Sequence, residues 1–518
     1  MDWKLKRCCT SSRLSPSCNV DRLSSLPDEL LCRILSMLST KDVIATVVLS
    51  NRMRKAFSWI TSIDLDDSPI SHCIKYSHLV ERFPLFESFV DNVSMKVSQA
   101  KQPLTRFRLG VGGDKNTHFR VLNKRHECQH ACFPVVRPAR LNVWLSYPLV
   151  HCSLKELDIS FHVGNPSEFK LPSELFACQS LEILKLDCYL EIGDGAEIPL
   201  VCLPNLKLLH LHSFVFTEDD FVTRLVSSCS SLEDLSITYC SWVKSDRVTI
   251  SSHSLRRLAL SINKCEEEKN SDLVLIDAPN LQYLLYDDDL PHRYSVTHMN
   301  ALVKATIYVI GMLRYDDFET SFRCQLSLVR ALSDVQHLSL LGYSAQNYYF
   351  AGKLKNQLPV FRNLRTLELG PFCNGKWERW DIVLMLILHC SPSLETLVFP
   401  EGLFESYGTY VCGNDPDMKE AALEAEGWRT TQTMPSCFLL HLKRIVFNCC
   451  FGFDRELNMI KFLVSKALVL EELVVCLSKE SDHHRYDPQN DAPNLDQFET
   501  SLQNLPRASH SSSITVER

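Results

Sequence analysis

The sequence predicts an α/β fold in which a short helical unit precedes a curved parallel β-sheet with helices, and an α+β segment caps the C-terminal end. Three observations lead to this prediction. Two short amphipathic stripes lie near the N-terminus, an L-x-x-L-x-L pattern recurs from Leu154 onward, and the C-terminal segment alternates strand and helix patterns.

The N-terminal stripes begin at Pro27, which is well placed at a first helical position because its missing N–H has no partner there. The apolar residues of the first stripe are Leu30, Leu31, Ile34, Leu35 and Leu38. Ser39 and Thr40 offer a stop and a new N-cap, and Val43, Ile44, Val47 and Val48 form a second stripe. So short a unit rarely sustains a core alone, so we expect it to pack against the following chain or against a partner helix.

The repeats carry an aliphatic residue at the first, fourth and sixth positions of each unit. The clear copies begin at Leu154, Leu181, Leu206, Leu232, Leu255 and Leu281, and weaker copies begin at Leu302, Val335, Leu364 and Leu394. A spacing of 20–29 residues is typical of a leucine-rich repeat, in which each turn contributes one strand and stacking completes the burial. Helical periodicity over 219–229 and 381–390 fits the segments between strands. A non-repeating α/β domain with leucine-rich helices is the weaker alternative.

The residues between the core leucines are expected to line the inner face of the curve. This mixed polar surface with scattered aromatic residues suits recognition of a target protein or peptide. The candidate binding residues are Asp158, Lys185, His210, His212, Thr238, Arg257, Tyr283, Lys304, Tyr308 and His337.

Composition restricts the function classes. The chain has 518 residues, 45% hydrophobic and 23% charged, as soluble globular proteins do. Its net charge of −7 argues against general nucleic-acid binding, which needs a basic surface. No apolar run approaches the roughly 18 residues of a membrane span, and the N-terminus lacks the apolar region of a secretory signal. We expect protein partners, with no nucleic acid and no membrane.

The 22 cysteines are scattered, and Cys178, Cys188, Cys202 and Cys240 have apolar neighbours. This pattern favours buried, reduced thiols in the cytoplasm, the nucleus or both.

The chain shows no complete catalytic or metal-binding motif. His126, Cys128, His130 and Cys132 have side chains suited to zinc, but their spacing is cramped and no second pair follows. An exposed polar insertion is the favoured interpretation and a metal site the minor one. Phosphate loops and hydrolase or zinc-protease motifs are absent from the sequence. We expect no enzymatic activity, no cofactor and no metal.

The run DRLSSLPDELLCRILSMLSTKDVIATVVLSNRMRKAF, residues 21–57, resembles the F-box of plant F-box proteins. The family usually reads L-S-K-R-W after the second helix, where this chain has Leu49-Ser50-Asn51-Arg52-Met53. The resemblance implies binding to a Skp-type adaptor, and through it to a cullin. The positions that it implies as adaptor-facing or supporting are Leu26, Pro27, Leu30, Leu31, Ile34, Leu35 and Val43.

Residues 438–476 and the closing P-R-A-S turn resemble the FBD module that follows the repeats in many plant F-box proteins. The whole pattern implies the substrate-recognition subunit of an SCF-type cullin–RING ubiquitin ligase, with the repeats holding an unknown target protein. The alternative is a leucine-rich-repeat interaction scaffold that is not stably assembled into a ligase, and Met53 is the residue that supports it.

The expected organisation has six parts. These are a disordered lead (1–20), an F-box (21–67), a connector with the first irregular repeats (68–150), leucine-rich repeats (151–400), a polar insertion (401–436) and an FBD-like domain (437–518).

Overall fold

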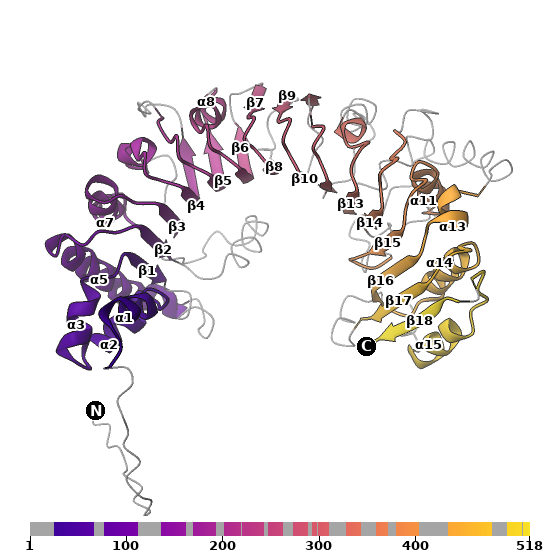
Figure 1. Ribbon diagram of the computed structural model, residues 1–518, viewed down its shortest axis with the longest axis horizontal. Helices are drawn as coiled ribbons and strands as arrows, with labels where there is room; N and C mark the ends of the chain where they lie inside the picture. Colours follow the sequence, from indigo (N-terminus) through magenta and orange to yellow (C-terminus); the bar gives the residue numbers. More distant parts are fainter. Residues whose placement is uncertain are drawn as a thin grey trace, which may run out of the picture.

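The protein forms an arch whose strands line the inner side and whose helices cover the outer side (Figure 1). In this computed structural model the described residues are 25–66, 77–111, 136–161, 169–192, 201–218, 220–242, 247–262, 273–288, 293–297, 299–309, 328–342, 359–370, 380–403, 434–478, 495–509 and 511–518. Three short helices stand at one end of the arch, and the last strand and helix stand at the other.

The helices differ in length along the arch. They are α1 (Asp28–Leu35), α2 (Thr40–Val47), α3 (Asn51–Phe57), α5 (Ser77–Gln99), α7 (Pro138–His151), the 3-10 helix η2 (Ser173–Ala177), α8 (Phe221–Ser228), α11 (Trp380–His389), α13 (Ser436–Leu440), α14 (Asp454–Val464) and α15 (Leu495–Gln503).

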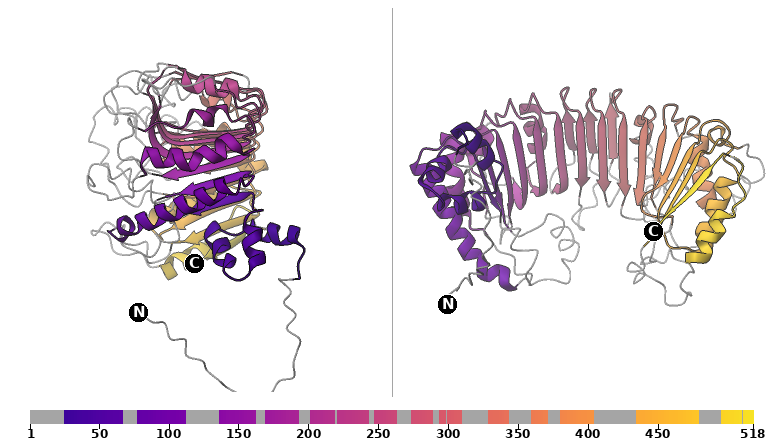
Figure 2. Two further views of the ribbon diagram at one scale, coloured as in Figure 1. Left: turned by 90° about the vertical axis from the view of Figure 1, so that its left-hand side faces the viewer. Right: turned by 60° about the horizontal axis from the view of Figure 1, so that its bottom comes forward.

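The inner side is a 15-stranded parallel sheet whose strands follow one another in chain order, as the right-hand view of Figure 2 shows. Its strands are β1 (Ser62–Asp66), β2 (Arg106–Gly110), β3 (Glu156–Phe161), β4 (Ile183–Ile192), β5 (Leu208–Phe216), β6 (Asp234–Trp242), β8 (Arg257–Ile262), β10 (Tyr283–Asp288), β12 (Lys304–Val309), β13 (His337–Gly342), β14 (Thr366–Leu369), β15 (Thr396–Phe399), β16 (Arg444–Cys450), β17 (Glu472–Leu477) and β18 (Ser513–Glu517). The sheet confirms the predicted fold class, and all ten predicted repeats supply a strand.

Alternation along each strand explains why the repeats stack. In β4, Leu184 and Leu186 are buried, whereas Lys185 between them is half-buried on the inner side. Leu184 aligns with Leu157 on β3 and Leu209 on β5, so each turn completes the burial of its neighbours. Backbone hydrogen bonds fix the same register, because the Lys155 carbonyl accepts the N–H groups of both Glu182 and Ile183 at 2.8 and 2.9 Å.

A second parallel sheet, of three strands, was not predicted. It consists of β7 (Arg247–Ser251), β9 (Leu273–Asp277) and β11 (Arg293–Thr297), in the order β11-β9-β7. Val248, Ile250, Val274 and Ile276 are buried in the main core. These strands therefore cover the core in their turns, as α8 does one turn earlier. Their short runs of alternating β-branched residues lack the leucine spacing by which the inner strands were predicted.

The main sheet extends beyond the predicted repeats in both directions. It begins at β1, inside the range expected for the F-box, and the predicted connector contains α5. At the other end, β16, β17 and β18 continue the sheet, while α14 and α15 supply the helices of the FBD-like segment. Glu456 stabilises this end, since its buried carboxylate accepts the N–H groups of Phe451, Gly452 and Phe453.

Several sequence predictions lie outside the described residues. They concern the lead 1–20, the part of the polar insertion from 404 to 433, and the His126–Cys132 cluster. Among the helices of the described ranges, none is long and apolar enough to cross a membrane. In the same ranges, no group of three or more His, Cys, Asp or Glu residues is placed to hold a metal ion.

The buried cysteines give a test of the core. Cys178, Cys188 and Cys240 are buried as predicted, whereas Cys202 is half-buried. Burial raises the pKa of Cys229 to about 12. Burial also raises the pKa of Cys240 to about 12, although hydrogen bonds with the backbone act to lower the pKa of that thiol.

We predict that iodoacetamide at neutral pH modifies exposed Cys449 in the native protein but leaves Cys229 and Cys240 unmodified. The thiolate is the reactive form, and both buried groups remain protonated and shielded. Mass spectrometry of tryptic peptides measures the modification, and a urea-unfolded sample in which all three react is the control. Equal modification of Cys240 and Cys449 in the native protein would contradict the packing.

Candidate protein-interaction surfaces

The helical unit α1–α3 has a small core of its own, separate from the core of the arch. Its buried side chains are Leu31, Leu35, Val43, Met53, Ala56 and Ile60. Ser39 caps α2 by accepting the N–H of Asp42 at 3.2 Å, and Ser50 caps α3 by accepting the N–H of Met53 at 3.1 Å. Local caps and one shared core therefore fold this unit.

An ion pair ties the third helix to the beginning of the first. The Arg52 guanidinium contacts the Asp28 carboxylate at 2.6 Å and donates a hydrogen bond to the Leu26 carbonyl. Both partners are partly exposed, so the contribution to stability is about 1 kcal/mol at most. Its main effect is to fix the position of Leu26 and Pro27.

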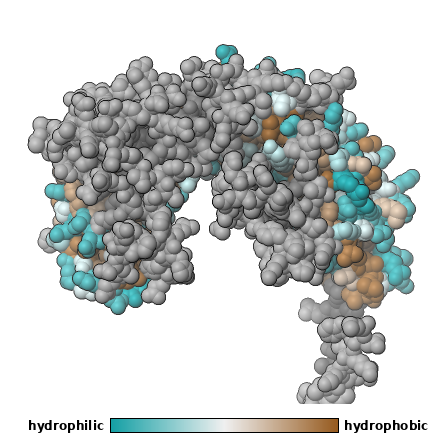
Figure 3. All heavy atoms as spheres, turned by 180° about the vertical axis from the view of Figure 1, so that it is seen from behind, coloured by the Kyte–Doolittle hydropathy of each residue, from teal (hydrophilic) through white to brown (hydrophobic). Residues whose placement is uncertain are grey.

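The helical unit also exposes large apolar side chains. They are Leu30, Ile34, Met37, Leu38, Val48 and Leu49, and Met37 is 76% exposed. Figure 3 shows hydrophobic surface over this unit at its lower right. Exposed apolar residues scattered singly are ordinary, but six within 20 residues of sequence indicate a protein-binding surface.

The seven positions predicted as adaptor-facing or supporting fall into two groups. Pro27, Leu30 and Ile34 are exposed and Leu26 is half-buried, so these four are available for contact. Leu31, Leu35 and Val43 are buried in the helical core and can only support that surface. Sequence periodicity alone did not separate the two groups, because, of two adjacent apolar residues such as Leu30 and Leu31, one can lie on the surface and the other in the core.

Met53, where the family usually has an aromatic residue, points into the helical core and is 6% exposed. The change from a ring to a thioether therefore acts on packing inside the unit rather than on its outer surface.

Hydrogen bonds join the helical unit to the arch. The Asp64 N–H on β1 donates to the Thr40 hydroxyl at 2.7 Å. The buried Gln102 side chain donates to the carbonyls of Phe57 and Ile60 at the end of α3. Thr40 and Gln102 are both almost fully buried, so these contacts are shielded from water.

The ten predicted inner-face residues lie in three rows that run across the strands in register. Arg257, Tyr283, Lys304 and His337 align in one row, and Asp158, Lys185 and His210 in the next. His212 and Thr238 pair in the third row, to which Tyr308 belongs by its alternation on β12. The parallel register thus brings together residues far apart in sequence.

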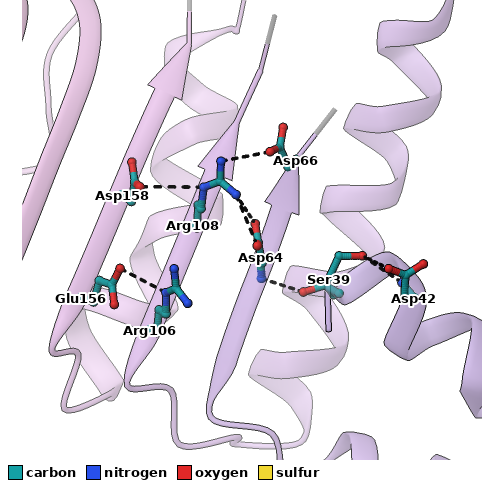
Figure 4. Close-up of polar contacts among 9 residues, drawn as sticks. Ser39, Asp42, Asp64, Asp66, Arg106, Arg108, Glu156 and Asp158 are labelled. Atoms are coloured by element: carbon teal, nitrogen blue, oxygen red, sulfur yellow. Dashed lines mark hydrogen bonds and ion pairs between the residues drawn. The ribbon is translucent and has the colours of Figure 1, made fainter. Parts of the chain in front are cut away.

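At the N-terminal end of the inner face, Arg108 lies among three carboxylates (Figure 4). It contacts Asp64 at 3.3 Å, Asp66 at 3.0 Å and Asp158 at 3.8 Å. Burial lowers the pKa of Arg108, but the three carboxylates outweigh burial and raise it. Arg106 pairs with Glu156 at 3.1 Å alongside. These arginines were not among the predicted inner-face residues, although both alternate with buried residues on β2.

In the middle of the face, a polar network crosses from β5 to β10. Asp234 contacts His210 and Arg257, each at 3.3 Å. Tyr239 lies at a β-bulge with a φ of 55°, packs edge-on against His212, and donates a hydrogen bond to Asp287 at 3.3 Å. Tyr239 was not among the predicted inner-face residues, because a bulge shifts the alternation by one residue.

Comparison with known proteins matches both parts of the molecule. Residues 23–62 match the F-box domain model, and residues 141–316 match the model described as FBD-associated F-box protein At5g56370, LRR repeats. The chain is 31% identical over 411 residues to F-box/LRR-repeat protein At4g14103 of Arabidopsis thaliana, which covers 76% of this chain and 94% of that protein. It is 27% identical to F-box/FBD/LRR-repeat protein At5g56420 of the same plant, covering 88% and 91%.

We predict that Met53→Ala destabilises the helical unit by about 2–5 kcal/mol, because it leaves a cavity in a small core. Met37→Ala, the same change at an exposed site of the same unit, should alter stability by about 0.5 kcal/mol or less. Hydrogen exchange of the α1–α3 amides measures both effects locally. Equal protection in the two variants would show that Met53 does not support the core.

Proposed function

Because the chain belongs to the F-box/LRR-repeat family, we propose that it is the substrate-recognition subunit of an SCF-type cullin–RING ubiquitin ligase. Its F-box would bind a Skp-type adaptor, and through it a cullin, while the inner face of the arch would bind a target protein. In this role the chain supplies proximity and orientation rather than a catalytic group. The reduced, buried cysteines support a location in the cytoplasm, the nucleus or both.

The observation that carries the proposal is the exposed apolar surface of α1 and the turn after it. Leu30, Ile34 and Leu38 recur at helical spacing, and each is at least 40% exposed. They lie directly over a core that already buries Leu31 and Leu35, so their outward faces are not used in the packing of this unit. An apolar helical surface that remains exposed in its own chain is typical of a site that a partner protein buries.

The hydrogen bonds through Thr40 and Gln102 support the second half of the proposal. They join the helical unit directly to β1 and to the residues before β2, in place of a flexible linker. A target bound by the inner face would therefore be held in a fixed orientation to the adaptor.

We predict that Leu30→Glu with Ile34→Glu lowers affinity for a purified Skp-type adaptor at least about 10-fold, since two charges would be buried at the contact. Isothermal titration calorimetry measures the affinity. Leu85→Glu is the matched control, because Leu85 is 73% exposed on α5, outside the F-box, and should leave binding unchanged. Circular dichroism checks that each variant remains folded.

If the wild-type protein shows no adaptor binding, or if the double variant binds equally well, the ligase assignment is overturned. The remaining assignment would then be a leucine-rich-repeat interaction scaffold.

A further inference from the structure

Charges on the inner side of the arch usually pair between neighbouring strands. In the positions that enter or begin the strands, the pairs are Lys155–Glu182 at 3.0 Å, Lys207–Glu182 at 2.9 Å, Arg106–Glu156 at 3.1 Å, Arg365–Glu395 at 3.1 Å, Lys443–Glu471 at 3.1 Å and Arg444–Glu472 at 2.7 Å. Each cation here meets a carboxylate from the adjacent turn. The pairing occurs at both ends of the arch.

The pairing becomes sparser in the middle, across β8, β10, β12 and β13, where Arg257 still contacts Asp234 of β6 at 3.3 Å. Arg256 enters β8 beside Glu233 of the preceding turn, but the equivalent residues of the next three turns are Gln282, Val303 and Gln336, none of which is charged. One position further, Lys304 lies between Tyr283 and His337 on the neighbouring strands. Within the described ranges, no ion pair joins Arg256 or Lys304 to another residue.

Basic and aromatic side chains surround Arg256 and Lys304. Arg257, 61% exposed in its side chain, stacks over the Tyr283 ring with its guanidinium carbon 4.8 Å from the centroid. The next row inward is uncharged and consists of Ala259, Leu285, Thr306 and Ser339. Asp287, which β10 places further along the same face, already accepts a hydrogen bond from Tyr239.

We infer that this middle patch, made of Arg256, Arg257, Tyr283, Lys304 and His337, binds an extended segment of the target protein that is rich in Asp and Glu. The inference rests on the proposed target-binding role of the inner face. Lys304 has no carboxylate at the equivalent position of either neighbouring strand, and Arg256 and Arg257 have one only on the side of β6. The patch is therefore complementary to acidic side chains, and the uncharged row beside it leaves room for an extended backbone. Neighbouring strands lie about 4.8 Å apart, so the four strands span the length of about five extended residues.

The test uses a fluorescein-labelled peptide of five glutamates flanked by Gly and Ser, with binding followed by fluorescence anisotropy. The full chain should bind this peptide, and Arg256→Glu with Lys304→Glu should weaken binding about 10-fold or more, since two attractive contacts become repulsive. Lys443→Glu is the matched control, because Lys443 is an exposed cation that enters β16, outside the patch, and should leave affinity unchanged. Binding should weaken as salt rises from about 0.05 M to about 0.5 M.

Three results would overturn the inference: no binding of the glutamate peptide by the wild-type chain, equal binding by the double variant, or tighter binding of a matched lysine peptide or single-stranded oligonucleotide. Thermal unfolding checks the fold of each variant, and Lys304→Gln, a milder change, replaces the double variant if that variant fails to fold. Adaptor affinity is measured on the same samples. Adaptor binding without peptide binding removes only this inference, whereas peptide binding without adaptor binding removes only the ligase assignment.

Discussion

The constraint on which the structure depends is the alignment of one buried aliphatic position through the whole parallel sheet. Leu157, Leu184, Leu209, Leu235 and Leu258 occupy equivalent positions on successive strands, and each is at most 1% exposed. No single turn could bury such a side chain, so stability comes from contacts between neighbours. The same alignment fixes the residues on either side of each leucine, and it therefore decides which polar side chains meet on the inner face.

A parallel sheet leaves its first strand with an unpaired edge, and the F-box covers that edge here. The Thr40 hydroxyl accepts the N–H of Asp64 on β1, and Gln102 satisfies two carbonyls at the end of α3. The F-box uses its buried contacts for this junction and for its own core, so its apolar outer surface is left for another protein. One unit thus protects the sheet and presents a separate binding surface.

The sequence predicted the parts that depend on regular spacing. All ten leucine repeats became strands, and the strand, helix and strand of the C-terminal segment formed β16, α14 and β17. Features that depend on packing between elements could not be predicted. Periodicity placed Leu30 and Leu31 on one stripe, although only Leu31 is buried. The sheet of β7, β9 and β11 lacks the leucine spacing, and the bulge at Tyr239 breaks the alternation that assigned residues to the inner face.

The distribution of inner-face charges follows from stacking geometry. Equivalent residues on adjacent strands lie about 4.8 Å apart, so like charges there would repel and opposite charges pair. Arg256 and Lys304 enter strands that have β10 between them, which separates them by about 10 Å, close to the Debye length at physiological salt. Their mutual repulsion is therefore weak, and the fold tolerates both cations, with Glu233 beside Arg256 and no carboxylate at the positions beside Lys304. An acidic side chain placed between them lies near both cations at once.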